Sequence, residues 1–501
     1  MIIAVIKTWM PLLVLLTSLM AAPAIFLLPE ERRHTRTVIN LAAAVIKLAL
    51  VTGMVLGVYA GHHYEMRFSV LVGVDFILRA DALGLMFAGL SSLLWLFTTI
   101  YAVGYLEGSP NRSRFFGFFS LCVASTLGIA LAGNLFTFVL FYELLTLSTY
   151  PLVVHRGTQK ALDAGKKYLQ YTLSGGVLLL LGIVALHSAA GDVAFGDTGL
   201  LAGMDARMHS YLIFVFIFLV AGFGVKAAMV PLHGWLPSAM VAPAPVSALL
   251  HAVAVVKAGA FGIVRVVYDV YGLELAFSLG LLRALTAAAA ITIIYGSLRA
   301  LSQTEIKRRL AFSTISQVSY IMLGVSMFHP MGAIAGLTHL IHQGLMKITL
   351  FFCAGNYAET LGIHHIDELD GTGRRMPVTS VAFTIGAFSM IGVPPAAGFV
   401  SKWYLGMGAA GTGMYWVIVV LAASSVLNAA YFLPMVYRIW FKRQQRNWPH
   451  EQDIGRLETT AWLLWPPVAT AIFSLGVGLL AGLPFSPVHW AQLIAMAEYL
   501  P

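Results

Sequence analysis

The sequence has 501 residues, of which 59% are hydrophobic and only 11% are charged, and its formal net charge is +9 at pH 7. A mean hydropathy of +0.83 excludes an ordinary soluble domain, which must cover its surface with polar groups. The composition therefore predicts a polytopic helical membrane protein. We attribute the positive charge to loops at one membrane face and not to a nucleic-acid interface.

Apolar stretches of about 20 residues, taken in chain order, predict fourteen membrane spans. The first is followed by the charged sequence PEERRHTR, which favours a membrane span over a cleaved signal peptide. The last segment, 486–501, is short, as expected of an interfacial helix. The predicted spans are 5–28, 38–60, 82–104, 114–132, 134–154, 167–188, 211–231, 243–268, 281–300, 308–328, 331–356, 378–399, 413–436 and 461–483.

Loop charges agree with this count, because Lys and Arg collect in cytoplasmic loops. In this sequence they follow the odd-numbered spans, whereas the loop 189–210 has Asp192, Asp197 and Asp205 against Arg207. The alternation predicts that both termini lie on the outer side of a prokaryotic cytoplasmic membrane. The basic residues after odd-numbered spans are Arg32, Arg33, Arg36, Arg112, Arg114, Arg156, Lys160, Lys166, Lys167, Arg299, Lys307, Arg308, Arg309, Arg374, Arg375, Arg438, Lys442, Arg443, Arg446 and Arg456.

Two further patterns predict the domain organisation. Residues 61–81 alternate loosely and contain the turn-like sequence VGVD, which predicts an external β-hairpin. A lysine stands beside prolines in span seven (GVKAAMVP) and again in span twelve (GVPPAAGFVSK), five spans later. We therefore expect two inverted five-helix repeats, spans 4–8 and 9–13, as in many secondary transporters. The expected divisions are an N-terminal three-helix segment with the hairpin (1–112), the first repeat (113–268), the second repeat (269–440) and a C-terminal helix and tail (441–501).

Residues 221–265 combine ionisable groups with broken helices inside an apolar region. They include Lys226, His233, His251 and Lys257 together with four prolines. A charged side chain at bilayer depth costs roughly 2.5–3.5 kcal/mol on insertion scales. A proline-broken helix also frees carbonyl groups that need a protein-lined or wet cavity. This combination is typical of transporter ion sites; the alternative is a kinked structural helix whose lysines extend to an interface.

Glu143 is the one carboxylate deep within the spans of the first repeat, and Lys226 is its expected partner. A buried carboxylate is stabilised by a cation within about 4–6 Å, and the pair would shift the proton affinity of both groups. We interpret the pair as a switch, with a purely structural ion pair as the alternative.

The eighth and eleventh spans carry further titratable groups. His251 and Lys257 lie about 120° apart around a helix, so they can face different neighbours. His251 can pass protons near neutral pH, unless it is a core histidine bonded to a carbonyl group. His339, Gln343 and Lys347 recur every four residues and form a polar stripe. Lysine suits a relay because its proton affinity shifts readily on burial.

Two further features are the lysine that ends this line and a closely spaced pair of histidines. Lys402, just after the twelfth span, is expected to close the line, with a lysine extended to the cytoplasmic edge as the alternative. His342 lies three residues from His339, but no Cys or acidic ligand stands nearby, so we expect no zinc. The histidines of the loop 362–367 are expected to be solvated.

Motifs for other energy sources are absent from the sequence. There is no Walker A pattern for ATP and no CxxC or haem motif for electron transfer. Cys122 and Cys353 lie in apolar runs and are expected to be core residues. We therefore expect no cofactor in this chain, and its energy would come from an ion gradient or from partner subunits.

Three sequences, PLHGWLPSAMVAPAPVSALLHAVAVVKAG, HLIHQGLMKITLFFCAG and GVPPAAGFVSKW, resemble a known family. They are similar to the antiporter-like proton-channel subunits shared by respiratory complex I, Mrp multi-subunit cation/proton antiporters and membrane-bound hydrogenases. The similarity covers roughly residues 80–440. It implies fourteen helices, two inverted five-helix repeats, broken helices seven and twelve, and a proton path from the cytoplasm along the central axis to the outside.

The resemblance also implies which residues form that path. Two departures stand out: Gln343 replaces a histidine found in many members, and the chain lacks the long lateral helix of one complex I member. A relay past Gln343 would need water or His342. The matching positions are Glu143 on helix five, Lys226 on helix seven, His251 and Lys257 on helix eight, His339 and Lys347 on helix eleven, and Lys402 on helix twelve.

The sequence thus predicts a proton-translocating subunit of a larger complex, with other membrane subunits, including further antiporter-like chains, as partners. Whether that complex is a redox-driven translocase stays open. Three alternatives also stay open: a Na⁺/H⁺ antiporter subunit that carries Na⁺ itself, a self-sufficient carrier of a small solute, and the membrane subunit of a bicarbonate- or CO₂-uptake complex. Few deep carboxylates accompany Glu143, which favours protons over Na⁺ as the ion here.

Overall fold

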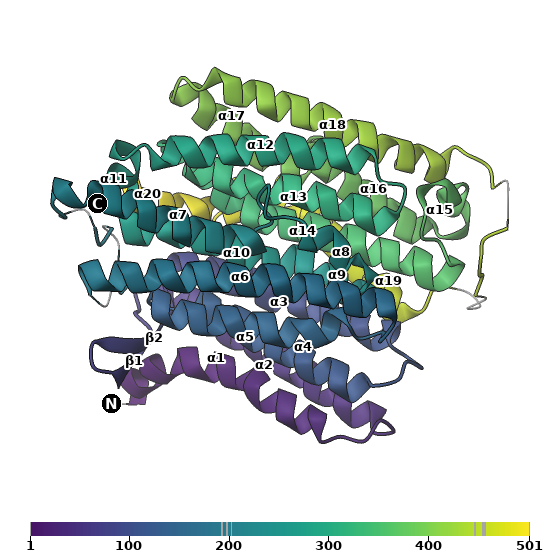
Figure 1. The fold of residues 1–501 in the computed structure, drawn as a ribbon. Helices are drawn as coiled ribbons and strands as arrows, with labels where there is room; N and C mark the ends of the chain where they lie inside the picture. The colour runs from purple at the N-terminus through teal and green to yellow at the C-terminus, as the bar shows by residue number, and fades with distance from the viewer. Residues whose placement is uncertain are drawn as a thin grey trace.

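The protein is a bundle of long helices that run back and forth between two ends, as seen in a computed structural model (Figure 1). The structure describes residues 2–191, 194–196, 199–201, 203–444, 447–452 and 457–499. Both termini lie at the end that also carries the β-hairpin, hereafter the hairpin end (Figure 1). Of the predicted loop charges, Asp192, Asp197, Arg446 and Arg456 lie outside the described residues.

The N-terminal half of the chain contains six long helices before the first broken helix. They are followed by a segment of short helices that includes two π-helical turns. The elements are α1 (Ile2–Phe26), α2 (Arg33–Tyr59), β1 (Glu65–Leu71), β2 (Val74–Arg79), α3 (Ala82–Tyr105), α4 (Arg112–Ala130), α5 (Leu135–Val153), α6 (Gln159–Ala190), η1 (Ala206–Met208), α7 (His209–Lys226), α8 (Trp235–Ser238), η2 (Ala239–Val241), α9 (Ala244–Ala248), η3 (Leu249–Val253), α10 (Val255–Arg265) and η4 (Val266–Tyr271).

The C-terminal half begins with long helices and contains the second broken helix. Its elements are α11 (Leu273–Ser278), α12 (Leu281–Leu301), α13 (Ile306–Val325), α14 (Pro330–Leu361), η5 (Ile366–Leu369), α15 (Thr372–Arg375), α16 (Pro377–Ile391), α17 (Ala397–Gly411), α18 (Tyr415–Trp440), α19 (Ala461–Leu479) and α20 (Pro487–Tyr499). The exposed histidines of the loop before η5 agree with the expectation of a solvated loop.

The prediction of an all-helical membrane protein is confirmed, but eleven helices in the described part of the chain are long and apolar enough to span a membrane, against fourteen expected. The other three predicted spans, 308–328, 331–356 and 378–399, are also helical. α13 and α14 fall outside the eleven, and α16 has only 15 residues. The count of fourteen stays a prediction.

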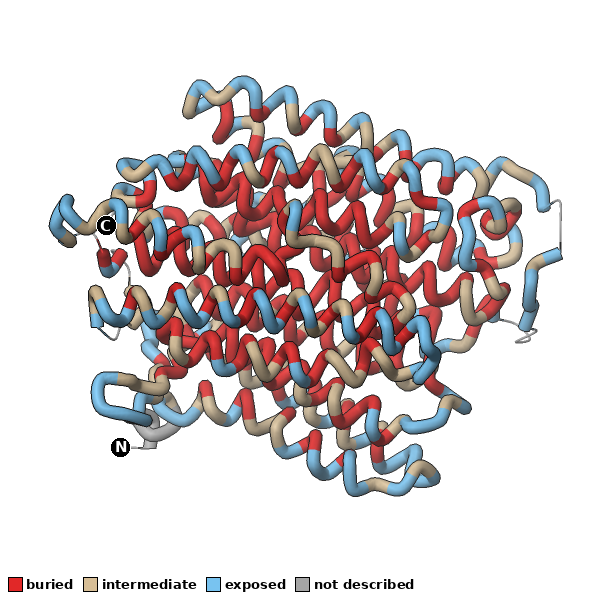
Figure 2. Tube along the Cα trace, viewed as in Figure 1, coloured by how far each residue is buried: buried red, intermediate tan, exposed pale blue. Residues whose placement is uncertain are grey.

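Burial explains why α13 and α14 are less apolar than an ordinary membrane helix. Nearly every residue of both helices is buried, and Figure 2 shows the buried part of the chain running through the middle of the bundle. α14 packs against α3, α13, α16, α17, α19 and α20. Because neighbouring helices and not lipid surround it, α14 tolerates polar side chains that a lipid-facing helix does not.

The twelfth predicted span extends further than its apolar residues indicated. α16 ends at Ile391, and a second helix, α17, continues to Gly411. The prediction that Lys402 follows the span is therefore wrong, since this residue lies within the second half of the broken helix. The amino group of Lys402 donates to carbonyl groups inside the protein. A charged residue therefore lies within the helix, beyond the end of the apolar run.

The predicted hairpin is confirmed as β1 and β2, which pair antiparallel with Glu65 opposite Arg79. Gly73 adopts a φ of 75° at the turn, a conformation that favours glycine. The hairpin attaches to the bundle through Arg79, whose backbone N–H donates to Leu131 O over 2.7 Å. It therefore lies against the junction of α4 and α5.

Glu30 caps a helix that is distant in the sequence. Its carboxylate accepts hydrogen bonds from the backbone N–H groups of Arg112 and Ser113, each over 3.0 Å, at the start of α4. Partial burial acts to raise the pKa of Glu30, but these two hydrogen bonds and the nearby Arg36 outweigh it and lower the pKa. The carboxylate form thus stabilises the connection between α1 and α4.

We expect Glu30→Ala to destabilise the protein by about 0.5–1 kcal/mol at pH 7, as for a lost N-cap. Because the folded pKa is lowered, this stabilisation is present above the unfolded value of about 4.3 and is lost as the pH falls through the folded value. Thermal melting of the detergent-solubilised protein should show the gap to wild type shrinking below about pH 4. Glu31→Ala, at an exposed neighbour, is the control; a gap independent of pH would contradict the assignment.

Candidate functional site

The first break in the helices positions Lys226. This lysine is the last residue of α7 and is completely buried. Two residues later Ala228 has a φ of 57°, so the chain leaves the helix before Pro231. The indole N–H of Trp235 donates over 2.7 Å to Val225 O, which also accepts the backbone N–H of Ala228 over 3.1 Å. The contact with Trp235 therefore fixes the C-terminal end of α7.

Lys226 interacts with Tyr142 on α5. Its amino group donates to Tyr142 O and lies 3.3 Å from the centre of the Tyr142 ring, a cation–π contact. Among the ion pairs of the described residues there is none between Lys226 and Glu143. The ion pair predicted from the sequence is thus not formed in this structure, because the amino group binds the carbonyl of the preceding residue on α5.

Glu143 lies half-buried beside α6. Its Oε1 atom is buried without a hydrogen-bond partner, and its carboxylate contacts the position of Gly176, where a Cβ atom would overlap it. A buried carboxylate oxygen without a donor is costly. Lys226 is thus bound to the residue next to Glu143, while this oxygen of Glu143 stays unsatisfied.

The segment from α9 to η4 carries the next two groups. His251 lies in the π-helical turn η3, a type of turn frequent at functional sites. Its ring stacks on Phe351 at 4.6 Å, and neither ring nitrogen has a hydrogen-bond partner. Lys257, on α10, donates to Leu340 O on α14 over 2.7 Å. Both residues thus face α14, although the helix geometry had left room for two different neighbours.

α14 continues the line toward α13. Gln343 donates to His251 O over 3.4 Å, and Lys347 donates to Leu310 O over 3.2 Å and to Ser313 Oγ. Gln343 therefore links the α9–η4 segment to the helix that carries Lys347. His342, the expected substitute for a second relay histidine, is buried with neither ring nitrogen hydrogen-bonded.

The second broken helix positions His339 and Lys402. His339 Nδ1 lies 2.7 Å from Ser401 Oγ on α17. Lys402 donates to Met390 O and Ile391 O at the end of α16, over 3.2 and 2.8 Å, and to Ser425 Oγ over 3.0 Å. These carbonyls belong to the last turn of α16 and have no helical partner of their own. Lys402 therefore does not extend to a membrane edge.

Tyr320 on α13 joins these two residues and was not predicted. Its ring lies 5.2 Å from the His339 ring and 5.6 Å from Lys402 Nζ. Its hydroxyl group donates to Ser424 Oγ over 2.7 Å. Ser401 could have been identified from its position beside Lys402, but nothing in the sequence links Tyr320 to α14 or α17, because that contact depends on tertiary structure.

Lys47 on α2 was also missed, although it is a lysine in the middle of a predicted span. It is 1% exposed, and its amino group lies 5.8 Å from the Trp95 ring. It shares the buried face of α2 with Arg36 and Asn40. Lys47 lies where α2 packs on Trp95 of α3. It is therefore apart from the lysines of α7, α10 and α14.

We expect Lys47→Met to leave the stability unchanged or to raise it by about 1 kcal/mol, because a side chain of similar shape removes the cost of a buried amine. Thermal melting of the purified complex measures this. Proton transport should be retained, since the residue lies apart from the line. A marked loss of stability would instead show that the amino group makes an important contact.

The site as a whole consists of buried amino and imidazole groups, of which the amino groups donate to carbonyl and hydroxyl oxygens. In the described residues none of Lys226, Lys257, Lys347 and Lys402 forms an ion pair with a carboxylate. No group of three or more His, Cys, Asp or Glu side chains that could hold a metal ion was found in the part of the chain that the structure describes. The groups are chemically suited to accept and release protons, with water between them where the gaps exceed hydrogen-bond reach.

The chain is similar to several known membrane proteins. The family described as NADH:quinone oxidoreductase/Mrp antiporter, TM matches residues 132–428. NADH-quinone oxidoreductase subunit N of Desulforudis audaxviator is 34% identical over 424 residues, which cover 81% of each chain. A probable K⁺/H⁺ antiporter protein of Rhizobium meliloti is 28% identical over 94% of this chain, but this chain spans only 47% of that relative.

A solved structure is similar over almost the whole chain. A chain of the Mrp complex from Dietzia sp. superposes with a TM-score of 0.85 at 23% sequence identity, covering 99% of this chain and 98% of that chain. At this identity the likeness establishes the fold.

Proposed function

The chain belongs to the NADH:quinone oxidoreductase/Mrp antiporter transmembrane family, and we propose that it is a proton-translocating subunit of a multi-subunit membrane complex. The proposal rests mainly on one observation. Buried lysines lie on α7, α10, α14 and α17, and each donates to a backbone carbonyl of another helix, while buried histidines lie on η3 and α14. Intramembrane ionisable residues in this arrangement are typical of proton relays.

The proposed route begins at Glu143 and Lys226. A change in a partner protein of the complex alters the interaction of Lys226 with Glu143, and the released proton passes along Lys257 and Lys347. Lys402 is the last group on the route. His251 and His339 assist, because imidazole accepts and donates protons near neutral pH, and water fills the gaps between them.

Two inverted repeats and fourteen spans are part of this proposal. α7 and α8 on one side and α16 and α17 on the other are both interrupted at proline-containing sequences, and each interruption has a lysine nearby. In the proposed repeats, 113–268 and 269–440, Lys226 ends the half-helix before the first break and Lys402 lies in the half-helix after the second. Inverted repeats with broken helices at the midplane are a common architecture of secondary transporters.

Protons are the proposed ion, and Na⁺ is the second candidate. A sodium site needs several oxygen ligands, usually carboxylate and carbonyl groups. The carbonyls freed at the end of α16 are already bound by Lys402. No group of three or more His, Cys, Asp or Glu side chains that could hold a metal ion was found among the described residues. We therefore assign any cation transport to a partner subunit, including in a complex of the K⁺/H⁺ or Mrp antiporter type.

The partners are proposed to be other membrane subunits, among them further antiporter-like chains, in the cytoplasmic membrane of a prokaryote. Mass spectrometry of the gently solubilised complex identifies them. Iron–sulfur or nickel proteins would assign the chain to a redox-driven pump, small membrane proteins to a cation/proton antiporter, and a soluble zinc protein to a bicarbonate- or CO₂-linked complex.

Reconstitution tests the proton transport itself. The complex in proteoliposomes, driven by its own electron donor or by a cation gradient, is expected to change the internal pH, as measured with a trapped pH-sensitive dye. A chain that purifies alone as a monomer, or a complex that moves its solute without any pH change, would contradict the proposal.

A further inference from the structure

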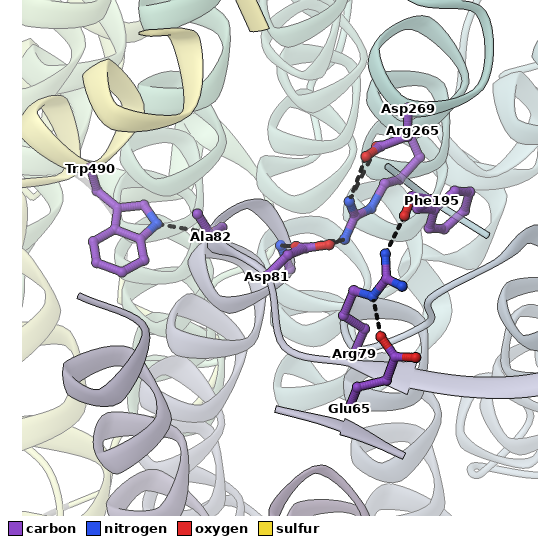
Figure 3. Close-up of polar contacts among 9 residues, drawn as sticks. Glu65, Arg79, Asp81, Ala82, Phe195, Arg265, Asp269 and Trp490 are labelled. Carbon is purple, nitrogen blue, oxygen red and sulfur yellow. Dashed lines mark hydrogen bonds and ion pairs between the residues drawn. The ribbon is translucent and has the colours of Figure 1, made fainter. Parts of the chain in front are cut away.

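Polar side chains outside the proposed proton route include a group at the hairpin end and a row on α18. At the hairpin end Arg265 forms ion pairs with Asp81 and Asp269 (Figure 3). In the same figure Trp490 of α20 points to the start of α3, where its indole N–H donates to Ala82 O over 2.8 Å. These contacts join the start of α3 to α10 and α20, which is a structural role.

The row on α18 lies on the buried face of this helix. Its members, Ser425, Asn428 and Tyr431, follow one another at intervals of three residues, so neighbouring members are adjacent on the helix surface. Asn428 and Tyr431 are completely buried, whereas Val419 and Val426 on another face of α18 are each 68% exposed. Buried polar groups within a membrane span are costly unless they are hydrogen-bonded, and they often mark a functional site.

One end of this row contacts Lys402. The amino group of Lys402 donates to Ser425 Oγ over 3.0 Å and to Met390 O over 3.2 Å. The side-chain amide of Asn428 donates to the same carbonyl, Met390 O, over 3.1 Å. Lys402 and Asn428 therefore share an acceptor at the end of α16, which places Asn428 beside the last lysine of the proposed route.

The other end of the row approaches Lys347. The Tyr431 hydroxyl group donates to Asn428 Oδ1 and also interacts with the Ser313 side chain on α13. Ser313 Oγ in turn accepts a hydrogen bond from Lys347. In addition, the Lys347 amino group lies 6.0 Å from the ring of Phe432, the residue after Tyr431. Hydroxyl and amide groups thus connect the lysine of α14 with the lysine of α17.

The alternative connection along α14 contains a wide gap. His339 lies 2.7 Å from the hydroxyl group of Ser401, the neighbour of Lys402. However, His339 precedes Lys347 by eight residues, which is about 12 Å along the helix axis. Several water molecules would be needed to bridge that distance. The series through α13 and α18 has a hydrogen-bonding group at each step.

We propose that the Tyr431 hydroxyl group relays protons from Lys347 to Lys402 and that Asn428 positions this hydroxyl group. The proposal rests on the proposed function, that protons pass along these lysines. The Lys347 ammonium gives a proton to Ser313 Oγ while the Ser313 hydroxyl proton passes to the Tyr431 oxygen. The Tyr431 proton passes to a water molecule, which protonates the neutral amine of Lys402. Each hydroxyl oxygen gains and loses one proton, Lys347 becomes the neutral amine, and Lys402 becomes the ammonium.

The hydrogen bond to Asn428 sets the direction of the Tyr431 proton between transfers. In this structure the hydroxyl group points to Asn428 Oδ1, and an amide side chain does not titrate. The hydroxyl group must therefore rotate from Asn428 to water before its proton can leave. Asn428 thus holds the relay in a non-conducting direction until that rotation occurs.

Tyr431→Phe tests the relay, because it removes the hydroxyl group and keeps the buried ring. We expect proton transport by the reconstituted complex to fall by about tenfold or more. The ratio of the transport rates in H₂O and D₂O should rise, because the step between the two lysines becomes rate-limiting. Ser313→Ala should have the same effects, and the double variant Ser313→Ala/Tyr431→Phe should be no worse than either single variant, because both remove one relay.

Tyr357→Phe is the matched control. Tyr357 is also a completely buried tyrosine, and its hydroxyl group shares a hydrogen bond with Ser380 of α16 over 2.9 Å, away from the series that joins the two lysines. This variant loses a buried hydroxyl group but no member of the relay. It should therefore transport protons at the wild-type rate, with an unchanged isotope effect.

A further variant separates the relay from a structural role. Tyr431→Phe leaves Asn428 Oδ1 without its donor, which weakens stability. Adding Asn428→Leu removes that unpaired amide, and Met390 O keeps Lys402 as its donor, so thermal stability and assembly should recover while transport stays low. Asn428→Leu alone keeps the hydroxyl group and should transport protons faster than Tyr431→Phe.

Three results would overturn the proposal. They are normal transport in assembled Tyr431→Phe, recovery of transport together with stability in the double variant Tyr431→Phe/Asn428→Leu, and equal losses in Asn428→Leu and Tyr431→Phe with unchanged isotope effects. If Tyr431→Phe does not assemble, its double variant with Asn428→Leu and Ser313→Ala decide.

The proposed function can fail separately. If Lys347→Met lowers transport and assembled Tyr431→Phe does not, only the relay through Tyr431 is wrong. If neither variant lowers it, the lysines themselves carry no protons.

Discussion

Lys347→Met is expected to lower proton transport by roughly tenfold or more. The substitution removes a titratable group on α14 that no neighbouring side chain of this helix replaces. Lys347 is completely buried at the centre of the bundle. It donates to Leu310 O and Ser313 Oγ on α13, whereas Gln343, one turn earlier on α14, cannot titrate. The two histidines of α14 lie more than a turn before Lys347, so neither replaces it at these acceptors. Proton transport by proteoliposomes that contain the assembled complex is the measurement.

Lys347→Arg distinguishes a relay from a fixed positive charge. A guanidinium keeps the charge and can donate to the same oxygens, but it does not release its proton. A relay therefore predicts that both variants lose transport, whereas an electrostatic anchor predicts that Lys347→Arg retains it. Lys47→Met is the matched control, a buried lysine away from the line. Both Lys347 variants must assemble at wild-type levels, and normal transport in either would contradict the relay.

The helices were largely predictable because their apolar length and their loop charges are local properties of the sequence. The hairpin over residues 61–81 was found from alternation and a turn sequence, and the structure has it at residues 65–79. The errors arose where tertiary contacts replace lipid. α17 continues past Lys402 because α16 supplies acceptors, and the buried α13 and α14 are more polar than a lipid-facing span.

The titratable residues of the site were also predictable from the sequence, because an ionisable side chain stands out in an apolar run. Their hydrogen-bond partners were not predictable. The sequence predicted Glu143 as the partner of Lys226, and the structure has Tyr142 O and the Tyr142 ring instead. Backbone carbonyls accept hydrogen bonds at every position, so no residue type marks the acceptor of a buried lysine. The ion pair between Asp81 and Arg265 was missed for a different reason: Asp81 is 184 residues from Arg265 and lies at the end of the predicted hairpin segment.

Lys226→Ala and Glu143→Gln are each expected to lower proton transport by about tenfold or more. Lys226 binds the carbonyl of the residue that directly precedes Glu143 on α5. The Glu143 Oε1 atom has no hydrogen-bond partner and can therefore accept the amino group if Lys226 changes its acceptor. We infer that the two side chains alternate between separated and paired states as the proton enters the line.

This switch predicts that the two substitutions are not additive. If Glu143 and Lys226 act as one unit, the double variant should be no worse than Lys226→Ala, because the second change removes an interaction already lost. Tyr142→Phe is the control: it removes the hydroxyl bond to Gly222 O but keeps the carbonyl and the ring, so it should transport protons. Additive losses would mean that the residues act independently, and unchanged transport in assembled Lys226→Ala would rule out the switch. Tyr142→Phe is a close control for the pairing, because Tyr142 directly precedes Glu143 on α5 and its carbonyl still accepts the Lys226 amino group.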